Sequence, residues 1–516
     1  MIRKTYVLIL FLMLIGSFFT VYDVVEMVSA KNGTTIYVDD DASSEWYDLT
    51  HFDTIQAAID AASLGDTIYV YSGIYYENIV IDKPIDLIGE NMNSTIIDGF
   101  GVGTVVTIFA NGVEITAVTI RNSGNSWREK DAGVKVRGNH TRIISDIIID
   151  NGYIGIDFYS SCCNVISGSI ISDNSQEGIK LVNSRNNNIS YSIITNNGDG
   201  ISLDHSSNST IINNSIINNN EGGIELHKCD NINITANVIT GNRWTGGIYL
   251  DDIYVVDDPN REIIISYNNI SSNNVGILFF NSNNNTIIGN TISENGNNGI
   301  SVIELKNSII AHNTITSNGN KGIHLSGTSD QFSSNNTITN NVINNNDNGG
   351  IHIDWKNINN IISNNTVTYN LCYGILLSSF NKNNIITNNT IIHDNSNAGS
   401  GINIERVNNT NNRIFYNNFI NKQHAIDDSN NIWYNVKTKK GNYWSSYDGK
   451  DSDGDGIGDT PYYIPGAGNN KDEYPVMKPF GGIKVENKES PDFELIFTFL
   501  AITIFLFWKR QRGRKI

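Results

Sequence analysis

The chain contains little of what several functional classes require. Its 516 residues include only five Met and nine His, and no tract is rich in either, which argues against copper handling. The formal net charge is −18, and the only dense basic segment is the Lys509–Lys515 tail, which argues against a nucleic-acid partner. Long apolar runs lie only near the two ends. Between them Asn, Asp, Ser and Gly interrupt the apolar residues so often that helices have no room to form.

A Gly-Ile-x-Leu phrase recurs along most of the chain instead. It returns every 22 to 24 residues, with a few longer gaps, and a second phrase of the type Asn-x-Ile-x-x-Asn-x-Ile lies between its copies. A fixed period of this length is typical of a solenoid with one supersecondary unit per repeat. The phrase begins at Gly133, Gly155, Gly178, Gly200, Gly223, Gly247, Gly276, Gly299, Gly322, Gly350, Gly374 and Gly401.

Each repeat has the pattern of short strands. Ile201 and Leu203 flank Ser202, and this alternation places the apolar side chains on one face of a strand. Asn tolerates left-handed backbone geometry at tight corners, and stacked Asn side chains can bond one another along the axis. Three short strands and three corners per repeat predict an all-β, single-stranded parallel β-helix of twelve or thirteen coils. A disordered Asn-rich tract is the alternative, and the regular Ile period disfavours it.

Composition divides the chain into seven segments. They are a signal peptide (1–30), an N-terminal cap with the first coils (31–110), the β-helix repeats (111–436), a C-terminal cap (437–480), a linker (481–492), a transmembrane or sorting segment (493–508) and a basic cytoplasmic tail (509–516).

The two ends predict export and attachment to a membrane. Arg3 and Lys4 precede an apolar run over 6–21, and Val28–Ala30 offers a small-residue cleavage site, as in a secretory signal peptide, with an uncleaved anchor as the alternative. The apolar run Phe493–Trp508 before the basic tail is a stop-transfer pattern, although it is shorter than a usual span. Export makes glycosylation plausible at Asn-x-Ser/Thr sites, for example Asn188, Asn208, Asn233, Asn269 and Asn388.

The four cysteines are not spaced for a disulfide framework. Cys163 and Cys229 lie three predicted coils apart, roughly 14 Å along the axis at the usual strand spacing, and Cys372 is farther still. Only an unusual vicinal bridge between Cys162 and Cys163 stays open. We expect the thiols to act as small apolar side chains.

Residues 35–99 carry motifs that resemble a known family. They read Thr35–Asp41, Phe52–Ala62, Gly65–Val70, Gly73–Tyr75 and Ile88–Glu90. Within them, 55–62 has the pattern of one short amphipathic helix that could close the end of the rod. The stretch resembles the N-terminal cap of pectin-lyase-like right-handed β-helix proteins. The repeats resemble the NosD-like or CASH (carbohydrate-binding and sugar hydrolysis) branch, and this resemblance implies the right-handed coil.

The C-terminal part extends the resemblance. Gly441–Ser445 followed by Asp451–Tyr462 is similar to the end of archaeal NosD-like surface proteins, and Ser490–Glu494 resembles an archaeal sorting signal with Asp492 in place of Gly. The resemblance implies a cell-surface protein of archaeal type, and it implies little about activity. The signature sequences of polygalacturonases and pectin methylesterases are missing from the chain.

An Asp-rich stretch near the C-terminus predicts a structural Ca²⁺ site. Carboxylates stand at positions 1, 3, 5 and 9, a main-chain carbonyl at position 7 and Gly456 at position 6, which is oxygen-rich calcium-loop spacing. Position 12 is Tyr462 rather than Glu, so a further ligand such as Asp472 or Glu473 would have to be borrowed. A solvated acidic turn is the alternative. The predicted ligands are Asp451, Asp453, Asp455, Ile457 and Asp459.

Outward positions on the Gly-Ile-x-Leu strands supply the candidate site residues. The second position after each Gly forms one column, and the fourth forms another in which Asp204, His227 and Asp251 follow in successive coils. Carboxylates beside a His could serve acid–base chemistry on a sugar or bind a cation, while a solvated charged face is the plainer interpretation. The candidate catalytic residues are Asp204, Glu225, His227 and Asp251.

Aromatic and histidine residues near these columns are candidates for binding a sugar. An insertion after Leu250 and another after Leu325 leave the same strand end and could flank a shallow groove. The candidate substrate-binding residues are Trp244, Tyr249, Tyr254, His324, His352, Asp354 and Trp355. The function that these features favour is non-catalytic binding to carbohydrate or another cell-envelope component. A polysaccharide lyase, hydrolase or epimerase is the first alternative, and a purely structural envelope protein is the second.

Overall fold

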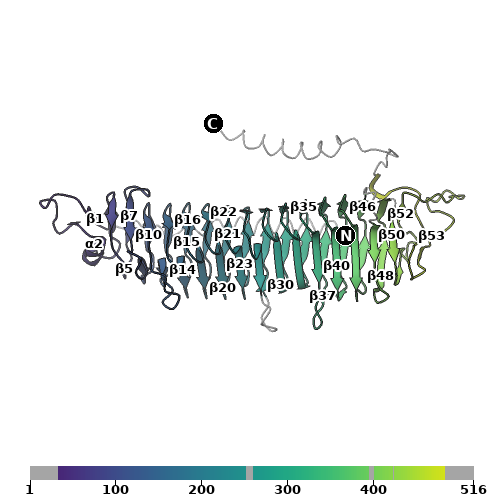
Figure 1. Ribbon diagram of the computed structural model, residues 1–516, viewed down its shortest axis with the longest axis horizontal. Coiled ribbons are helices and arrows are strands. Elements are labelled where there is room, and N and C mark those ends of the chain that lie inside the picture. The colour runs from purple at the N-terminus through teal and green to yellow at the C-terminus, as the bar shows by residue number, and fades with distance from the viewer. Residues whose placement is uncertain (1–32, 252–259, 394–399, 422, 483–516) are drawn as a thin grey trace, which may run out of the picture.

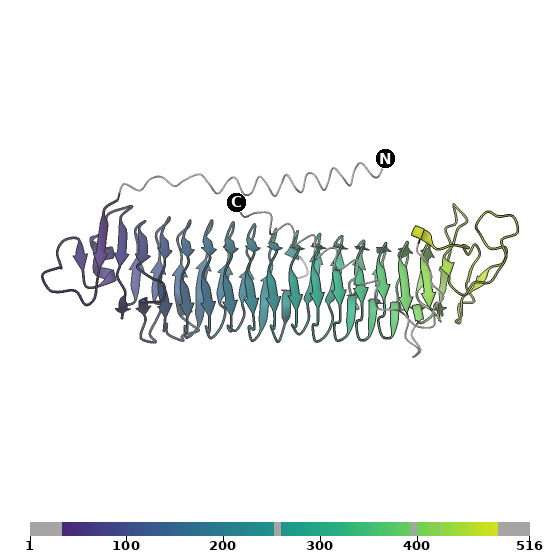
Figure 2. The same cartoon turned by 90° about the horizontal axis from the view of Figure 1, so that it is seen from above.

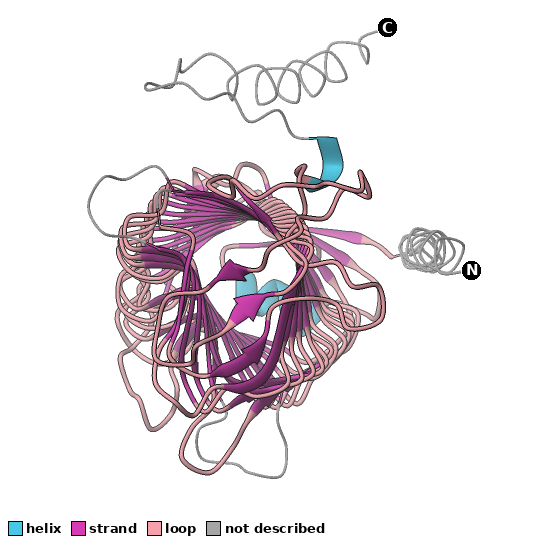
Figure 3. Cartoon of the chain, turned by 90° about the vertical axis from the view of Figure 1, so that its right-hand side faces the viewer, coloured by secondary structure: helices cyan, strands magenta, loops and turns pink. Residues whose placement is uncertain are grey.

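The chain winds into a long rod of stacked coils (Figures 1 and 2). The computed structural model describes residues 33–251, 260–393, 400–421 and 423–482. Each strand of a coil pairs in parallel with the equivalent strand of the next coil, as Ile201 in one coil pairs with Ile224 in the following one. The predicted parallel β-helix is therefore confirmed, and its three sheets run the length of the rod (Figure 3).

The first two sheets carry the strands of the Asn-x-Ile phrases and their N-terminal equivalents. The first sheet consists of β2 (His51–Phe52), β1 (Thr35–Val38), β3 (Thr67–Val70), β6 (Asp86–Gly89), β9 (Glu114–Thr116), β12 (Arg142–Ile144), β15 (Val165–Ser167), β18 (Asn188–Ser190), β21 (Thr210–Ile212), β24 (Asn233–Thr235), β28 (Ile264–Ser266), β31 (Thr286–Ile288), β34 (Ile309–Ala311), β38 (Thr337–Thr339), β42 (Ile361–Ser363), β45 (Ile385–Thr387), β48 (Thr410–Phe415) and β51 (Asn430–Ile432). The second consists of β4 (Gly73–Tyr75), β7 (Thr95–Asp98), β10 (Thr119–Arg121), β13 (Ile147–Ile149), β16 (Ile170–Ser172), β19 (Ile193–Thr195), β22 (Ser215–Ile217), β25 (Val238–Thr240), β29 (Asn269–Ser271), β32 (Thr291–Ser293), β35 (Thr314–Thr316), β39 (Val342–Asn344), β43 (Thr366–Thr368), β46 (Thr390–His393), β49 (Asn418–Asn421) and β52 (Tyr443–Trp444).

The third sheet carries the Gly-Ile-x-Leu phrases and is called the Gly-Ile sheet below. It consists of β5 (Ile79–Ile81), β8 (Val106–Ile108), β11 (Ala132–Val136), β14 (Ile154–Tyr159), β17 (Ile179–Val182), β20 (Ile201–Asp204), β23 (Gly222–His227), β26 (Gly246–Asp251), β30 (Ile277–Asn283), β33 (Ile300–Lys306), β36 (Lys321–Ser326), β40 (Gly349–Trp355), β44 (Tyr373–Ser379), β47 (Ser400–Ile404) and β50 (Ala425–Asp427), with the short strands β27 (Asn260–Arg261), β37 (Ser333–Ser334) and β41 (Asn357–Ile358). Among the described residues the second sheet alone has 16 strands. The estimate of twelve or thirteen coils is thus too low, because the N-terminal coils lack the Gly-Ile phrase.

The glycine of the phrase is required by the stacking of the coils. A Cβ atom on Gly200 would lie 2.5 Å from the carbonyl oxygen of Gly223 and 2.9 Å from Nδ2 of Asn219. Both distances are shorter than a carbon atom tolerates, so only Gly fits where the main chain passes an interior Asn. The Ile and Leu that follow, such as Ile201 and Leu203, are fully buried in the apolar core.

Buried asparagines form ladders along the rod, as the Asn-rich repeats predict. In each ladder, Asn Nδ2 donates to the Oδ1 of the Asn one coil further on, over 2.9–3.2 Å in the first ladder. These bonds satisfy polar groups that would otherwise be costly inside the core. The two longest ladders are Asn151, Asn174, Asn197, Asn219, Asn242, Asn273, Asn295, Asn318, Asn346 and Asn370, and Asn214, Asn237, Asn268, Asn290, Asn313, Asn341, Asn365, Asn389, Asn417 and Asn442.

The C-terminal residues close the last coil with aromatic rings and the buried carboxylate of Asp472. Trp444 stacks between Phe419 (ring centroids 4.5 Å apart) and Tyr462 (4.3 Å). Asp472 accepts from Asn442, the last member of its ladder, and from the Trp444 indole N–H at 2.9 Å. Burial raises the pKa of Asp472 to about 6. Beyond these residues come the hairpin β53 (Tyr462–Tyr463) and β54 (Lys471–Asp472), and the 3₁₀ turn η1 (Phe480–Gly482).

One α-helix is present among the described residues, α2 (Ile55–Ala61), and it lies at the opposite end. Its residues Ile55, Ala58 and Ile59 are buried, and it packs on β1, β2, β3 and β5. Among the described residues no helix is long and apolar enough to span a bilayer. The predicted signal peptide (1–30) and the segments from 493 onward lie outside the described residues.

Candidate functional site

The outward side chains of the Gly-Ile sheet form columns in the register that the sequence predicts. Lys180, Ser202, Glu225, Tyr249 and Leu278 pair in turn from β17 to β30. In the neighbouring column Asp204 pairs with His227, and His227 with Asp251. Parallel strands lie ~4.8 Å apart, so each column presents one outward side chain about every 5 Å along the rod.

Glu225, His227, Tyr249 and Asp251 meet on β23 and β26, and we call them the acid–histidine patch. His227 Nε2 lies 3.5 Å from a Glu225 carboxylate oxygen, and the Tyr249 hydroxyl donates to Asp251 at 2.7 Å. The rings of His227 and Tyr249 meet edge to face with centroids 6.3 Å apart. Hydrogen bonding to Glu225 raises the pKa of His227 in spite of its partial burial. The imidazole therefore binds a proton more readily here than in water.

A further carboxyl group lies behind this patch. Asp199 is 9% exposed and accepts the main-chain N–H of Gly222 at 2.8 Å. Burial, together with the charge of Glu225, raises the pKa of Asp199 to about 7. Sequence reasoning missed Asp199 because it lies in a corner before β20 rather than at an alternating strand position. Asp204, the remaining predicted catalytic residue, instead bonds His205 Nδ1 at 2.6 Å.

The predicted aromatic residues are spread over a wider area than the patch itself. Phe280 meets the Tyr249 ring edge to face at 6.2 Å, so Tyr249 lies between His227 and Phe280. Trp244 is 80% exposed in the corner that precedes β26. Tyr254 lies outside the described residues, as does most of the insertion after Leu250, so the structure does not test the predicted groove.

Three coils further along, His324, His352 and Asp354 form the paired-histidine patch on β36 and β40. His324 Nε2 lies 3.4 Å from Asp354 Oδ2, and His352 Nε2 lies 3.8 Å from Asp354 Oδ1. The two imidazole rings are 5.2 Å apart. One donor atom from each of the three residues lies within 4.8 Å of the other two, so the geometry admits a shared metal ion.

The surroundings of the two imidazoles differ from those of His227. His352 is only 7% exposed, its Nε2 bonds the Ser378 hydroxyl at 2.7 Å, and its buried Nδ1 has no hydrogen-bond partner among the described residues. Burial lowers the pKa of His352 to about 3. A hydrogen bond from His324 lowers the pKa of Asp354. Trp355, the last predicted residue here, packs on Phe380 with ring centroids 4.8 Å apart.

The acidic loop near the C-terminus brings three of its predicted ligands together. Asp451, Asp453 and Asp455 each offer an oxygen within 4.8 Å of the other two. Asp459 instead accepts from the main-chain N–H and hydroxyl of Ser452. The suggestion of Asp472 as a borrowed ligand is wrong, because that carboxylate is fully buried against Trp444 and Asn442.

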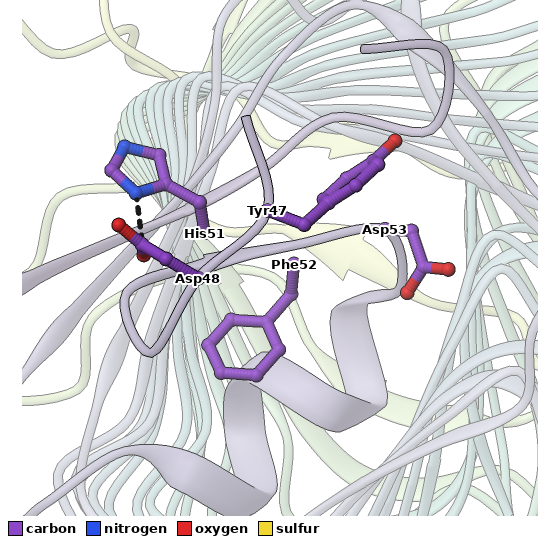
Figure 4. A pocket seen from close by; sticks show the side chains of 5 residues that line it. All are labelled: Tyr47, Asp48, His51, Phe52 and Asp53. Atoms are coloured by element: carbon purple, nitrogen blue, oxygen red, sulfur yellow. Dashed lines mark hydrogen bonds and ion pairs between the residues drawn. The ribbon is translucent and has the colours of Figure 1, made fainter. Parts of the chain in front are cut away.

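A hollow at the N-terminal end was not foreseen (Figure 4). It measures about 310 Å³ and is lined by Tyr47, Asp48, His51, Phe52 and Asp53. His51 Nδ1 lies 2.8 Å from Asp48, and this bond lowers the pKa of that carboxyl group to about 2. These residues lie in the short strand β2 and the turns beside it, a stretch with no periodic pattern, so no sequence signal placed them together.

Two family models match the chain. One, described as "Right handed beta helix region", covers residues 104–253, and the other, described as "Periplasmic copper-binding protein (NosD)", covers 223–354 and 326–449. Together with the parallel pairing of successive coils, they support a right-handed parallel β-helix fold. No curated protein matches it in sequence.

Solved structures are similar to this chain at low sequence identity. The N-terminal fragment of bacteriophage phi29 gene product 12 is 15% identical with a TM-score of 0.50, over 71% of this chain and 76% of that one. The Dettilon tailspike protein is 16% identical with a TM-score of 0.44, over 72% and 68%. The A-module of the Azotobacter vinelandii mannuronan C-5 epimerase AlgE6 is 16% identical with a TM-score of 0.34, over 73% and 92%. These likenesses concern the fold alone.

Proposed function

We propose that the protein is an exported carbohydrate-binding protein that holds a glycan along the Gly-Ile sheet, across the acid–histidine patch. The observation that carries the proposal is the register of β20, β23 and β26, which sets hydrogen-bonding groups and an aromatic ring on consecutive coils. Such a column of side chains can contact the hydroxyl groups and ring faces of a glycan once per coil. Carboxylates, an imidazole and a phenol supply the acceptors and donors that orient hydroxyl groups.

The charge of the patch favours a neutral or amino-sugar polymer over an acidic one. Glu225 interacts electrostatically with Asp199, and Glu225 and Asp251 both interact with His227, the one side chain of the patch that becomes cationic. The carboxylates of the patch would repel the carboxylate of a uronate, so an acidic polymer would be disfavoured. The hydroxyls of a neutral glycan, or the ammonium of an amino sugar, would be accepted.

A binding panel tests this proposal. The protein is titrated calorimetrically with a neutral glucan, an amino-sugar polymer and alginate, beside the Tyr249→Ala and His227→Ala variants. His312→Ala provides a matched control, since His312 is an exposed histidine elsewhere on the rod. We expect binding to a neutral or amino-sugar polymer that both patch variants weaken and His312→Ala does not. Equal binding by all variants, or a preference for alginate, would contradict the proposal.

One observation favours an enzyme as the second candidate. Asp199, with its pKa raised to about 7, interacts electrostatically with Glu225, and a carboxyl group of raised pKa beside a second carboxyl group is typical of acid–base catalysis on glycosides. Release of reducing ends in the same panel would identify the activity. It should fall in Asp199→Asn and in Glu225→Gln. Binding without any product would leave the non-catalytic function in place.

We also propose that Asp451, Asp453, Asp455 and Asp459, with the Ile457 carbonyl, bind Ca²⁺ and order the C-terminal cap. The convergence of three carboxylates supports this proposal, as do the positive φ angles of Gly454 and Gly456, which let the loop turn sharply. Chelation of calcium should lower the thermal stability of wild type but not of Asp453→Ala. If chelation leaves the thermal stability of wild type unchanged, or lowers that of Asp453→Ala equally, the loop does not bind Ca²⁺.

Export and retention at the outer face of a membrane complete the proposal. The signal-peptide pattern at 1–30 and the apolar segment 493–508 with its basic tail support it. The periplasmic description of the NosD model agrees with export. Fractionation of expressing cells checks both: we expect surface-exposed protein that detergent, and not salt, releases.

A further inference from the structure

We propose that His324, His352 and Asp354 bind one divalent first-row transition-metal ion. This site lies apart from the acid–histidine patch and from the Asp-rich loop, and it does not depend on the glycan proposal. Two imidazoles and one carboxylate are a donor set that suits Zn²⁺ and its neighbours, whereas Ca²⁺ prefers oxygen donors alone.

The distances between the donor atoms suit an ion placed among them. With metal–ligand bonds of about 2.0–2.1 Å, the donors around tetrahedral Zn²⁺ lie about 3.3 Å apart. His324 Nε2 and Asp354 Oδ2 are 3.4 Å apart, and His352 Nε2 is 3.8 Å from the other oxygen of the same carboxylate. Small side-chain rotations therefore complete the site without movement of the strands.

The backbone holds the two imidazoles together. His324 and His352 are paired residues on β36 and β40, in sheet register, and Asp354 follows two residues after His352 on the same outward face. Hydroxyl groups surround the pair: Ser301 lies 3.4 Å from His324 Nδ1, and Ser378 lies 2.7 Å from His352 Nε2. The contact with Ser301 leaves Nε2 of His324 as the nitrogen that faces Asp354, as a second-shell hydrogen bond does in known metal sites.

Burial is the second observation that points to a ligand. His352 is 93% buried, so little water competes with an ion for its Nε2, and the ion would take the place of the Ser378 hydroxyl that bonds this nitrogen at 2.7 Å. The Asp354 side chain is 37% exposed, which leaves a path for the ion and a coordination position open to solvent.

One neighbouring charge opposes cation binding. Lys321 lies at the start of β36 and interacts electrostatically with Asp354 and His352. Its ammonium would repel a divalent ion, so removal of that charge should strengthen metal binding. This gives the proposal a variant that gains affinity, and a gain cannot be explained by unfolding.

Calorimetric titration with Zn²⁺ tests the site. Millimolar Ca²⁺ is present to occupy the acidic loop, and the background carries Cys162→Ser and Cys163→Ser, because those thiols lie 3.2 Å apart and also attract zinc. Even the loss of a second-shell partner weakens metal sites by about 10–100-fold, so we expect His324→Gln and Asp354→Asn to weaken binding by about 100-fold or more. His312→Gln should bind as wild type does, and Lys321→Met should bind several-fold more tightly.

Co²⁺ provides an independent readout of the coordination. We expect visible d–d absorption bands from wild type that Asp354→Asn reduces and His312→Gln retains. Zinc affinity that is unchanged in both His324→Gln and Asp354→Asn would overturn the proposal, as would a loss in His312→Gln of the same size. Cu²⁺ binding does not distinguish this site from other groups of donors on the protein, because Cu²⁺ binds more tightly than Zn²⁺ to any such donor set.

Discussion

The acid–histidine patch and the paired-histidine patch occupy the same backbone frame on one sheet. Glu225 and Tyr249 are paired across β23 and β26, as His324 and His352 are across β36 and β40, and an Asp follows two residues after the second member in both. Yet the pKa of His227 is raised and that of His352 is lowered to about 3. The coil therefore fixes positions only, and the side chains on neighbouring coils decide the chemistry.

The cause of the difference is burial and the number of carboxylates. The His227 side chain is 36% exposed beside Glu225, with Asp251 on the next strand. The His352 side chain is 9% exposed, with a second imidazole and one carboxylate beside it. Acidic neighbours stabilise the imidazolium ion of His227, whereas desolvation keeps His352 neutral. A neutral imidazole is a metal ligand, and a protonated one is a hydrogen-bond donor.

The largest expected effect comes from converting one patch into the other. Because the frames are equivalent, the double variant E225H/Y249H places two imidazoles and Asp251 in the arrangement of the paired-histidine patch. We expect a second zinc equivalent in calorimetry, with affinity raised about 100-fold or more over the unmodified patch. E225H alone is the control and should gain far less. A double variant that folds and binds only one equivalent would show that the frames are not equivalent.

The contributions of His352 and His227 to the folding stability of the protein should change with pH in opposite directions. The folded-state pKa of His352 is about 3 against about 6.5 unfolded, so its contribution is present above pH 6.5 and is lost as pH falls. The raised pKa of His227 gives stability that is present below pH 6.5 and is lost as pH rises through the folded pKa.

Metal-free denaturant unfolding at pH 5 and pH 8 measures both slopes. His352→Gln should lose less stability on acidification than wild type does, by a few kcal/mol at most at about 1.4 kcal/mol per pKa unit. His227→Gln should lose more stability on acidification than wild type does. The difference should be smaller than for His352→Gln, because the His227 side chain is more exposed. If the stability of the two variants changes identically between pH 5 and pH 8, the proposed difference between His352 and His227 is wrong.

The smallest effects concern single hydroxyl groups. Ser378→Ala removes the partner of a buried imidazole nitrogen and should cost about 1–3 kcal/mol in the free energy of unfolding. Tyr249→Phe removes the bond to Asp251, which is on a more accessible surface, and should cost about 0.5–1.5 kcal/mol. Urea titration measures the free energy of unfolding of both variants. A larger loss in Tyr249→Phe than in Ser378→Ala would contradict the deeper burial of the His352–Ser378 bond.

Much of the fold follows from the sequence, because the same contact recurs in every coil. The Gly-Ile-x-Leu phrase predicts which residues face outward, and the pairings of Glu225 with Tyr249 and of His324 with His352 follow from alignment alone. The Asn ladders follow from the second phrase. The N-terminal coils were not counted, because their sequence lacks the Gly that marks a coil.

The candidate site was predicted less completely. The alternation of apolar and polar residues shows which side chains point outward, but it does not show which of these are buried by their neighbours. Ser202, Glu225 and His352 hold equivalent positions, and only the packing of neighbouring side chains makes His352 a buried group. Asp199 and the hollow at Tyr47 lie in corners and loops without period. Asp472 looked like a surface ligand, and its burial depends on Trp444, 28 residues away.

Zinc located by anomalous scattering tests the contrast between the two patches most directly. Crystals of the wild-type protein are soaked with Zn²⁺ and measured on both sides of the zinc absorption edge. We expect a peak about 2.0–2.1 Å from the facing nitrogens of His324 and His352, and none among Glu225, His227 and Asp251. A peak at His227 with none at His352 would contradict this expectation.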